Sequence, residues 1–378
     1  MFWNPATITD IPGIHSEWDV SGIFPTADLK AVAPTPTLGL GNAGNIGMNG
    51  GLAAAYPSYQ FNDNLWLGLA TTSPYGLSTK TNFNWAGQVY GRSARIVSFD
   101  GTPTIGWKVN DWISVGAGVT VEYINVRLTR ALGVLPNTPS AILEGDNVGV
   151  GYALGATFKP LPWTEIGIGF RSSIHHELDG TLTAPPAPGF PILSLPAKAN
   201  INTPEDVTLG LRQRISPEWT LLAGLEWTNW SRLNIVPVTT LGVPATALPL
   251  QYKDGYMASV GAEYEWSPLL TFRAGLGYEW SPIDTANRQV FIPDNNRIWT
   301  SIGATYHWSE KLSFDLSYAH LFPGSPKLQI VPGSAQYVGV PFFGKADASI
   351  NIVSASFKYR WDDPTKTIPV TQPIIRKD

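Results

Sequence analysis

The strongest constraint on the fold is a two-residue alternation of apolar and polar side chains. In residues 113–123, every second residue from Ile113 to Tyr123 is apolar, and the residues between them are Ser114, Gly116, Gly118, Thr120 and Glu122. The same pattern recurs in residues 256–266, 270–280 and 298–308. Successive side chains of a β-strand point to opposite faces, so the pattern predicts strands with one apolar face. Because helical periodicity is nowhere comparable, we expect an all-β protein.

The connections between the predicted strands alternate between short and long. Six short turns fall at 61–64, 108–111, 159–162, 215–218, 267–268 and 309–310. Seven long loops fall at 31–49, 75–85, 129–146, 179–200, 233–253, 281–296 and 322–346. Thirteen connections join fourteen strands. Short turns at one end and long loops at the other are the organisation of a transmembrane antiparallel β-barrel.

Tryptophan marks one end of these strands. Eight of the 15 tryptophans lie within a few residues of a short turn or of the final strand's end: Trp66, Trp107, Trp112, Trp163, Trp219, Trp266, Trp308 and Trp361. Strand propensity explains frequent Trp but not its restriction to strand ends. A ring of indoles at one height is typical of a membrane interface. We therefore infer that the apolar face contacts lipid and the polar face lines a lumen.

Composition excludes several other classes of protein. Charged residues make up 14% of the chain, against roughly 25% in soluble domains, and no apolar run of about 18 residues could form a membrane-spanning helix. A net charge of −4 argues against nucleic-acid binding. The absence of Cys excludes disulfides, thiolate metal sites and Cys nucleophiles. The start MFWNPATITD lacks the features of a signal peptide, so we expect an upstream segment to be missing.

Four blocks of sequence carry a resemblance to a known family. They are FWNPA at 2–6 followed by Pro12-Gly13, the stretch 62–91, KVNDWISVGAGVTVEY at 108–123, and residues 282–306 with Pro282, Arg288, Pro293, Asp294, Arg297, Trp299, Gly303 and Tyr306. Asp315, Tyr318 and the segment NIVSASFKYRW continue the match. The chain resembles, over nearly its whole length, the FadL/TodX family of outer-membrane transporters for long-chain fatty acids and aromatic hydrocarbons.

The resemblance implies a fourteen-stranded barrel plugged by an N-terminal hatch. On this basis we assign residues 1–15 to a remnant of the hatch, 16–361 to the barrel with long extracellular loops, and 362–378 to a polar tail that we expect to be disordered. Most of the hatch is absent from this sequence. We expect Met1 to be a misassigned start; a genuine start would leave the barrel more open.

The resemblance also implies a mechanism of passive uptake. A groove among the outer loops captures the ligand, a lumenal pocket receives it, and a kink in the third strand opens the wall toward the membrane. We expect that strand at 65–74 and take Ser73, Pro74, Tyr75 and Gly76 as candidates for the lateral opening, because Pro cannot donate to the sheet ladder. The alternative is that Pro74 merely ends the strand.

Two further groups of residues follow from the same comparison. Asn4, Pro5 and Ala6 are candidates for hatch gating beneath the pocket, or form a tight turn that ties the hatch to the wall. Apolar residues of the outer loops are candidates for the capture groove, or pack loop against loop: Leu132, Val134, Leu135, Phe190, Ile192, Leu193, Leu195, Leu241, Val243, Leu248 and Leu250.

Charged residues on the polar face form a further set of candidates. They are Glu122, Glu165, Arg171, Glu226, Glu263, Arg273, Glu279 and Asp315. Enclosed charges need partners, so one interpretation is a structural ladder that braces the wall. The other makes Arg171 or Arg273 an anchor for a fatty-acid carboxylate, with Glu122 and Glu263 among the same lumenal charges. Sequence spacing does not choose between them.

No catalytic motif is present, so we expect neither enzymatic activity nor a cofactor. His175-His176-Glu177 could in principle hold a metal, but we expect solvated residues at a strand's outer end and predict no metal site. The expected partners are a hydrophobic small molecule and outer-membrane lipid, with no nucleic acid and a monomeric barrel in a Gram-negative outer membrane. The alternatives are a diffusive porin for small hydrophilic solutes, which needs a strongly charged constriction, and a barrel with an adhesin or structural role.

Overall fold

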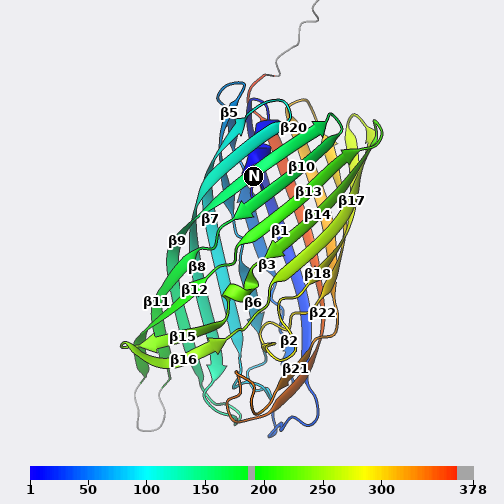
Figure 1. Cartoon of the computed structure of the whole chain (residues 1–378). Coiled ribbons are helices and arrows are strands. Elements are labelled where there is room, and N and C mark those ends of the chain that lie inside the picture. Colours follow the sequence, from blue (N-terminus) through cyan, green and yellow to red (C-terminus); the bar gives the residue numbers. More distant parts are fainter. Residues whose placement is uncertain (186–191, 364–378) are drawn as a thin grey trace, which may run out of the picture.

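A single closed antiparallel barrel makes up most of the molecule (Figure 1). The computed structural model describes residues 1–185 and 192–363. Fourteen wall strands pair with their neighbours in chain order. The first, β1 (Ile14–Ala31), closes the barrel against the last, β22 (Phe342–Arg360), from the pair His15–Arg360 to the pair Ala31–Gly344. The prediction of a fourteen-stranded barrel is confirmed.

Seven wall strands are continuous and seven are interrupted once. The continuous ones are β1, β7 (Ser93–Lys108), β8 (Ile113–Ala131), β9 (Ser140–Leu161), β18 (Leu270–Trp280), β19 (Arg297–His307) and β22. The interrupted ones are β3 (Gly50–Ala55) with β4 (Ser58–Gln60), β5 (Leu65–Thr72) with β6 (Gly76–Lys80), β10 (Thr164–Arg171) with β11 (His175–Ala184), β12 (Leu193–Asn202) with β13 (Asp206–Arg214), β14 (Trp219–Thr228) with β15 (Ile235–Thr240), β16 (Val243–Pro249) with β17 (Gly255–Ser267), and β20 (Leu312–Pro323) with β21 (Lys327–Ile330).

Three short elements lie outside the wall. β2 (Gly44–Asn45) belongs to the loop after β1 and pairs back onto that strand. Two 3-10 helices, η1 (Pro5–Asp10) and η2 (Trp230–Arg232), precede β1 and follow β14. Within the described residues, no helix is long and apolar enough to cross a membrane.

The alternation in the sequence places apolar side chains on the outside of the barrel. On β8, Val119 and Val121 are 53% and 46% exposed, whereas Thr120 between them is 2% exposed and Glu122 is fully buried. A soluble protein would bury the valines and expose the polar residues. An outer surface of this kind needs an apolar medium around it, which is the arrangement of a lipid-facing barrel.

The tryptophan girdle is present with one exception. Seven of the eight tryptophans named above are exposed on the outer surface at the short-turn end: Trp107, Trp112, Trp163, Trp219, Trp266, Trp308 and Trp361. Trp66 is only 3% exposed, and its indole N–H donates to the carbonyl oxygen of Ile11 (2.9 Å). Its assignment to the girdle was wrong, because the side chain points inward and binds the chain that enters the barrel.

The strands extend further at the long-loop end than the sequence suggested. The predicted loop 75–85 contains β6, and the predicted loop 233–253 contains the β15–β16 hairpin. These strands continue the hydrogen-bonded ladder beyond the apolar band. Their residues there do not face lipid, so they lack the hydrophobic alternation that would have predicted them. In Figure 1, β15, β16 and β21 lie at this end, opposite the end that carries the short turns.

The outer loops pack on one another around a small hydrophobic core. It consists of Leu29, Ala43, Ile46, Trp85, Val290, Leu328, Ile330, Phe342 and Ala346. The rings of Trp85 and Phe342 meet edge to face with centroids 5.4 Å apart. Loops that are far apart in sequence therefore form one packed layer at the outer end, and this layer bounds the interior of the barrel from that side.

Candidate functional site

The N-terminal segment, residues 2–10, lies inside the barrel against the wall. Asn4 caps η1, because its Oδ1 accepts from the amide N–H of Ala6 (2.9 Å). Its Nδ2 donates to the carbonyl oxygen of Ala156 on β9 (2.9 Å). Pro5 begins η1, where a missing N–H costs nothing. The structure thus brings the three hatch candidates together as a capped turn that is tied to the wall.

Glycines on the inner face of the wall give this segment its space. A Cβ on Gly155 would lie 2.0 Å from Oδ1 of Asn4, and one on Gly169 would lie 1.8 Å from the carbonyl oxygen of Trp3. Neither contact is possible between real atoms, so these positions accept only glycine while the segment is docked. The Gly-rich polar face therefore serves as a docking surface as well as a lumen lining.

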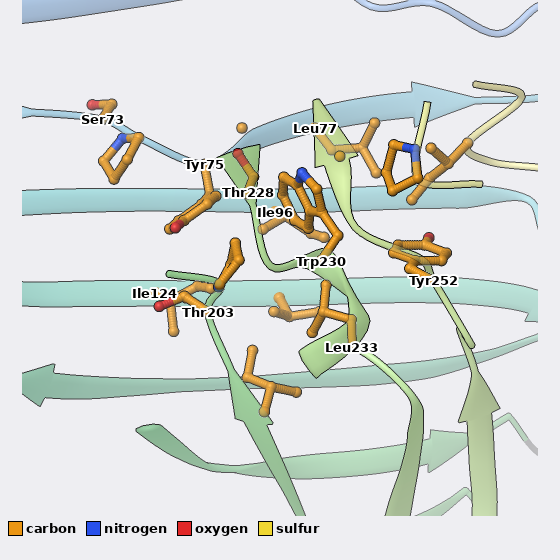
Figure 2. Close-up of a pocket in the computed structure, with 18 of the residues that line it drawn as sticks. Ser73, Tyr75, Leu77, Ile96, Ile124, Thr203, Thr228, Trp230, Leu233 and Tyr252 are labelled. Carbon is orange, nitrogen blue, oxygen red and sulfur yellow. The ribbon is translucent and has the colours of Figure 1, made fainter. Parts of the chain in front are cut away.

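A cavity of about 1000 Å³ occupies the lumen between this segment and the outer loops. Phe2 and Trp3 line it at the inner end, and Ile283 and Phe291 of the loop 281–296 line it at the outer end. Figure 2 shows apolar side chains from several strands converging on it, among them Leu77, Ile96 and Ile124. Its size and lining are those of a site for a hydrophobic small molecule.

The third wall strand is broken where the cavity meets it. β5 ends at Thr72 and β6 begins at Gly76, so Ser73, Pro74 and Tyr75 are outside the ladder. All four lateral-opening candidates, Ser73 to Gly76, line the cavity. The break in pairing expected at Pro74 is present. The alternative that Pro74 merely ends the strand was wrong, because β6 resumes the pairing with β7 at the pair Gly76–Val97. Pro74 interrupts the strand and does not terminate it.

An aromatic pair lies beside this break. The ring of Tyr75 meets that of Trp230 edge to face, with centroids 6.1 Å apart (Figure 2). Trp230 belongs to η2, and Nε of Arg232 in the same turn donates to Oε2 of Glu205 (2.8 Å). Opposite charge holds Arg232 and Glu205 together. The contact fixes η2, so Trp230 stays inside the cavity.

Arg171 is committed to a partner within the chain. Its Nη2 donates to Oδ2 of Asp100 on β7 (2.7 Å), and both side chains are buried. The hydroxyl of Thr72 donates to the other oxygen of Asp100. The guanidinium also lies 4.0 Å from the ring centre of Phe2. Arg171 therefore links the wall to the N-terminal segment and is not among the residues that line the cavity.

Arg273, Glu263 and Glu122, the other candidates for a contact with the ligand carboxylate, are also paired. Arg273 donates to Glu263 (2.7 Å) and Asp315 (3.2 Å), whereas Oε1 of Glu122 lies 3.0 Å from Nε2 of His176. None of these side chains lines the cavity. A ligand carboxylate would have to displace a carboxylate of the protein from either arginine.

His176 corrects one expectation. We expected solvated residues at His175-His176-Glu177, but His176 is fully buried against Glu122, while His175 is exposed. The strand continues past this point in β11, so the pair lies inside the wall. Within residues 1–185 and 192–363, no group of three or more metal-ligating side chains is assembled.

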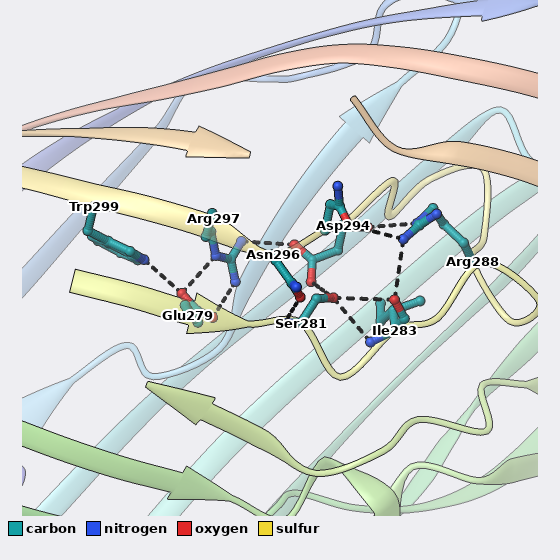
Figure 3. Close-up of polar contacts among 9 residues, drawn as sticks. Glu279, Ser281, Ile283, Arg288, Asp294, Asn296, Arg297 and Trp299 are labelled. Carbon is teal, nitrogen blue, oxygen red and sulfur yellow. Dashed lines mark hydrogen bonds and ion pairs between the residues drawn. The ribbon is translucent and has the colours of Figure 1, made fainter. Parts of the chain in front are cut away.

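A polar network holds the loop 281–296 over the outer end of the cavity (Figure 3). Arg297 donates to Glu279 (2.7 Å) and to Asp294 (2.9 Å). Arg288, which is buried, donates to the carbonyl oxygens of Asp294 (2.7 Å) and Lys327 (2.6 Å). In the sequence, Arg288, Asp294 and Arg297 were noted only because the block at 282–306 resembles the family. The structure shows which groups they contact.

The apolar loop residues separate by burial, and Val134 and Leu195 are half-buried. Leu248 and Leu250 line the cavity. Leu132, Leu135, Ile192, Leu193, Leu241 and Val243 are exposed. Phe190 lies outside the described residues.

Trp230, Tyr252 and Asp294 are among the cavity side chains to which sequence reasoning gave no role. Trp230 and Tyr252 follow strands at breaks that the sequence did not predict, and Asp294 was noted without a role. For Trp230, the signal was its position directly after the alternating segment of β14. Tyr252 lies in the predicted long loop 233–253, where nothing marked it.

Comparison with known proteins decides the family. Residues 1–361 match the family described as outer membrane protein transport protein (OMPP1/FadL/TodX). The chain belongs to this family. The long-chain fatty acid transport protein of Escherichia coli O6:H1 (strain CFT073) is 24% identical over 374 residues, which cover 88% of this chain and 83% of the relative. The 47 kDa outer membrane protein of Pasteurella multocida (strain Pm70) is 23% identical over 393 residues, which cover 94% and 88%.

Solved structures of the FadL/TodX family share the fold. A FadL homologue from Pseudomonas aeruginosa has a TM-score of 0.84 at 23% identity and covers 95% of this chain and 93% of its own. The toluene transporter TodX of P. putida has a TM-score of 0.71 at 17% identity, with coverage of 96% and 93%. The resemblance seen in the sequence is therefore confirmed, and this protein is an outer-membrane β-barrel of a transport family from Gram-negative bacteria.

Proposed function

We propose that this protein takes up hydrophobic molecules passively, without catalysing a reaction. An apolar groove among the outer loops captures the ligand, the lumenal cavity receives it, and the break at Ser73–Gly76 releases it into the membrane. The substrates are long-chain fatty acids or aromatic and aliphatic hydrocarbons. The protein acts as a monomer in contact with outer-membrane lipid, and Asn4, Pro5 and Ala6 take part in gating.

One observation carries the proposal, namely that the cavity and the wall break coincide. A hydrophobic solute gains nothing from an aqueous path, because each apolar surface it exposes to water costs about 25 cal/mol per Å². An exit through the wall lets it pass from an apolar cavity directly into hydrocarbon. The lining by Ser73, Pro74, Tyr75 and Gly76 supports such an exit.

Two matched substitutions separate a lateral route from an axial one. A Cβ on Gly76 or on Gly210 would meet nothing within 4 Å. Gly76 lines the cavity at the break, whereas Gly210 on β13 does not line it. Gly76→Trp should therefore obstruct a lateral exit, and Gly210→Trp should leave it open.

The assay is uptake of labelled alkane, aromatic hydrocarbon and fatty acid by a deletion strain that carries each variant. We expect roughly tenfold slower uptake with Gly76→Trp and near wild-type uptake with Gly210→Trp. The reverse order would mean that the solute travels along the barrel axis, as in a porin. Undiminished uptake of all three ligands by the deletion strain itself would refute the transport function.

A further inference from the structure

The cavity is lined by more carboxylates than cations. Its acidic side chains are Asp19, Glu144, Asp206, Glu226, Glu279 and Asp294, and its basic ones are Lys198 and Arg297. Nζ of Lys198 lies 2.9 Å from Asp179. Arg297 is held between Glu279 and Asp294 (Figure 3). Both cations of the lining are thus neutralised by the protein itself, so an anionic head group would find no free positive charge here.

One buried polar group of the lining has no partner. Tyr252 is 9% exposed, and its hydroxyl makes no hydrogen bond to any of the described residues. Its backbone N–H donates to the carbonyl oxygen of Leu233 (3.1 Å), which anchors the residue next to η2. Figure 2 shows the Tyr252 ring among the side chains of the cavity. Buried hydroxyls are normally hydrogen-bonded, so this one calls for a partner that comes with the ligand.

We propose that the cavity binds an uncharged hydrophobe that carries one oxygen, such as an alcohol, a phenol or a ketone, and that the Tyr252 hydroxyl donates to that oxygen. The inference rests on the proposed function and names, among hydrophobic ligands, the class that this cavity favours over the fatty acids and hydrocarbons named there. A pure hydrocarbon would leave the Tyr252 hydroxyl without a partner. A ligand with a carboxylate would find no free cation of the protein in the lining. An ammonium group at Tyr252 lacks a free carboxylate, because Asp294 already accepts from Arg297 and Ser281.

The test compares four ligands of equal chain length: decane, 1-decanol, decanoate and decylammonium. Each displaces the fluorescent probe N-phenyl-1-naphthylamine from the purified full-length barrel in detergent at pH 8, with free aqueous concentrations measured. Each ligand is compared between wild type and Tyr252→Phe in the same detergent, so that partitioning into micelles cancels.

We expect Tyr252→Phe to weaken the binding of 1-decanol roughly three- to tenfold, as for one lost hydrogen bond. The binding of decane should be unchanged. Tyr56→Phe is the matched control, because Tyr56 also lines the cavity but is only partly buried. It should affect no ligand selectively. Glu226→Gln, which removes a lining carboxylate that forms no ion pair among the described residues, should strengthen decanoate binding several-fold.

The outcomes distinguish the two proposals. If no ligand displaces the probe, the transport function itself fails. If the ligands bind but decanoate or decylammonium binds wild type more tightly than 1-decanol does, the function stands and the inference is overturned. An equal effect of Tyr252→Phe on decane and 1-decanol would overturn it as well.

Discussion

Replacing Gly169 by alanine tests whether the inner-face glycines hold the N-terminal segment in place. The new Cβ would lie 1.8 Å from the carbonyl oxygen of Trp3, which now accepts from the hydroxyl of Thr208 (3.2 Å). To reach 3.0 Å, the shortest contact that real Cβ atoms show, the oxygen must retreat by about 1.2 Å. Overpacking of this kind costs about 1–3 kcal/mol.

This free-energy cost should destabilise the docking of residues 2–10 and leave the stability of the barrel wall unchanged. β10 pairs with β9 and β13 on its two sides, whereas residues 2–10 have no strand pairing with the wall in the described part of the chain. A penalty of about 1–3 kcal/mol lowers the docked population relative to the undocked one by about 5- to 150-fold. Amide hydrogens of η1 should exchange faster by a factor in that range, while those of β10 keep their protection.

Hydrogen–deuterium exchange measured by mass spectrometry is the assay, and Gly210→Ala is the control. Gly210 pairs with Gly167 on the adjacent strand, and a Cβ there would meet nothing within 4 Å. Equal exchange of η1 in Gly169→Ala and Gly210→Ala would refute the docking argument. Loss of protection across the whole barrel would refute the claim that the wall is independent of the segment.

Two further predictions concern the stability of the barrel, measured by urea unfolding in detergent. His176→Leu leaves Glu122 buried without its partner and should cost about 3–5 kcal/mol; His176→Leu combined with Glu122→Leu should recover most of it, and a fully stable single variant would contradict the pairing. Arg360 lowers the pKa of Asp362 to about 2. Because the folded pKa lies below the ordinary 3.8, the stabilisation is complete well above that pH and is lost as the pH falls through about 2. The difference in unfolding free energy between wild type and Asp362→Asn should therefore shrink to a small remainder at about pH 2 and vanish near pH 1, and an undiminished difference at about pH 1 would refute this assignment.

The sequence predicted the fold well because lipid makes the alternation unusually regular. Every wall strand that crosses the apolar band must present apolar side chains outward, so Val119 and Val121 alternate with Thr120 without exception. Beyond the band this requirement ends, and the same reasoning misplaced the outer hairpins β11–β12 and β15–β16.

The candidate site was less predictable because its contacts are distant in sequence. Arg171 and Asp100 are 71 residues apart, and Asp100 was not among the predicted lumenal charges. Trp66 follows the girdle pattern but faces inward, since Ile11 offers its carbonyl oxygen to the indole. The alternation along one strand indicates which face of the sheet a side chain occupies, provided that the strand is not interrupted. It gives no information about which distant residue that side chain contacts.

The wall breaks raise a physical problem, because an unpaired backbone group facing hydrocarbon costs several kcal/mol. Hydroxyl side chains solve it on three strands. The Ser98 hydroxyl accepts from the N–H of Tyr75 (2.9 Å), that of Ser172 accepts from Tyr152 (2.9 Å), and that of Thr203 accepts from Ile174 (3.1 Å). Pro74 has no N–H to satisfy. These breaks can therefore persist in the folded barrel, so the proposed opening in the third strand need not be created by the ligand.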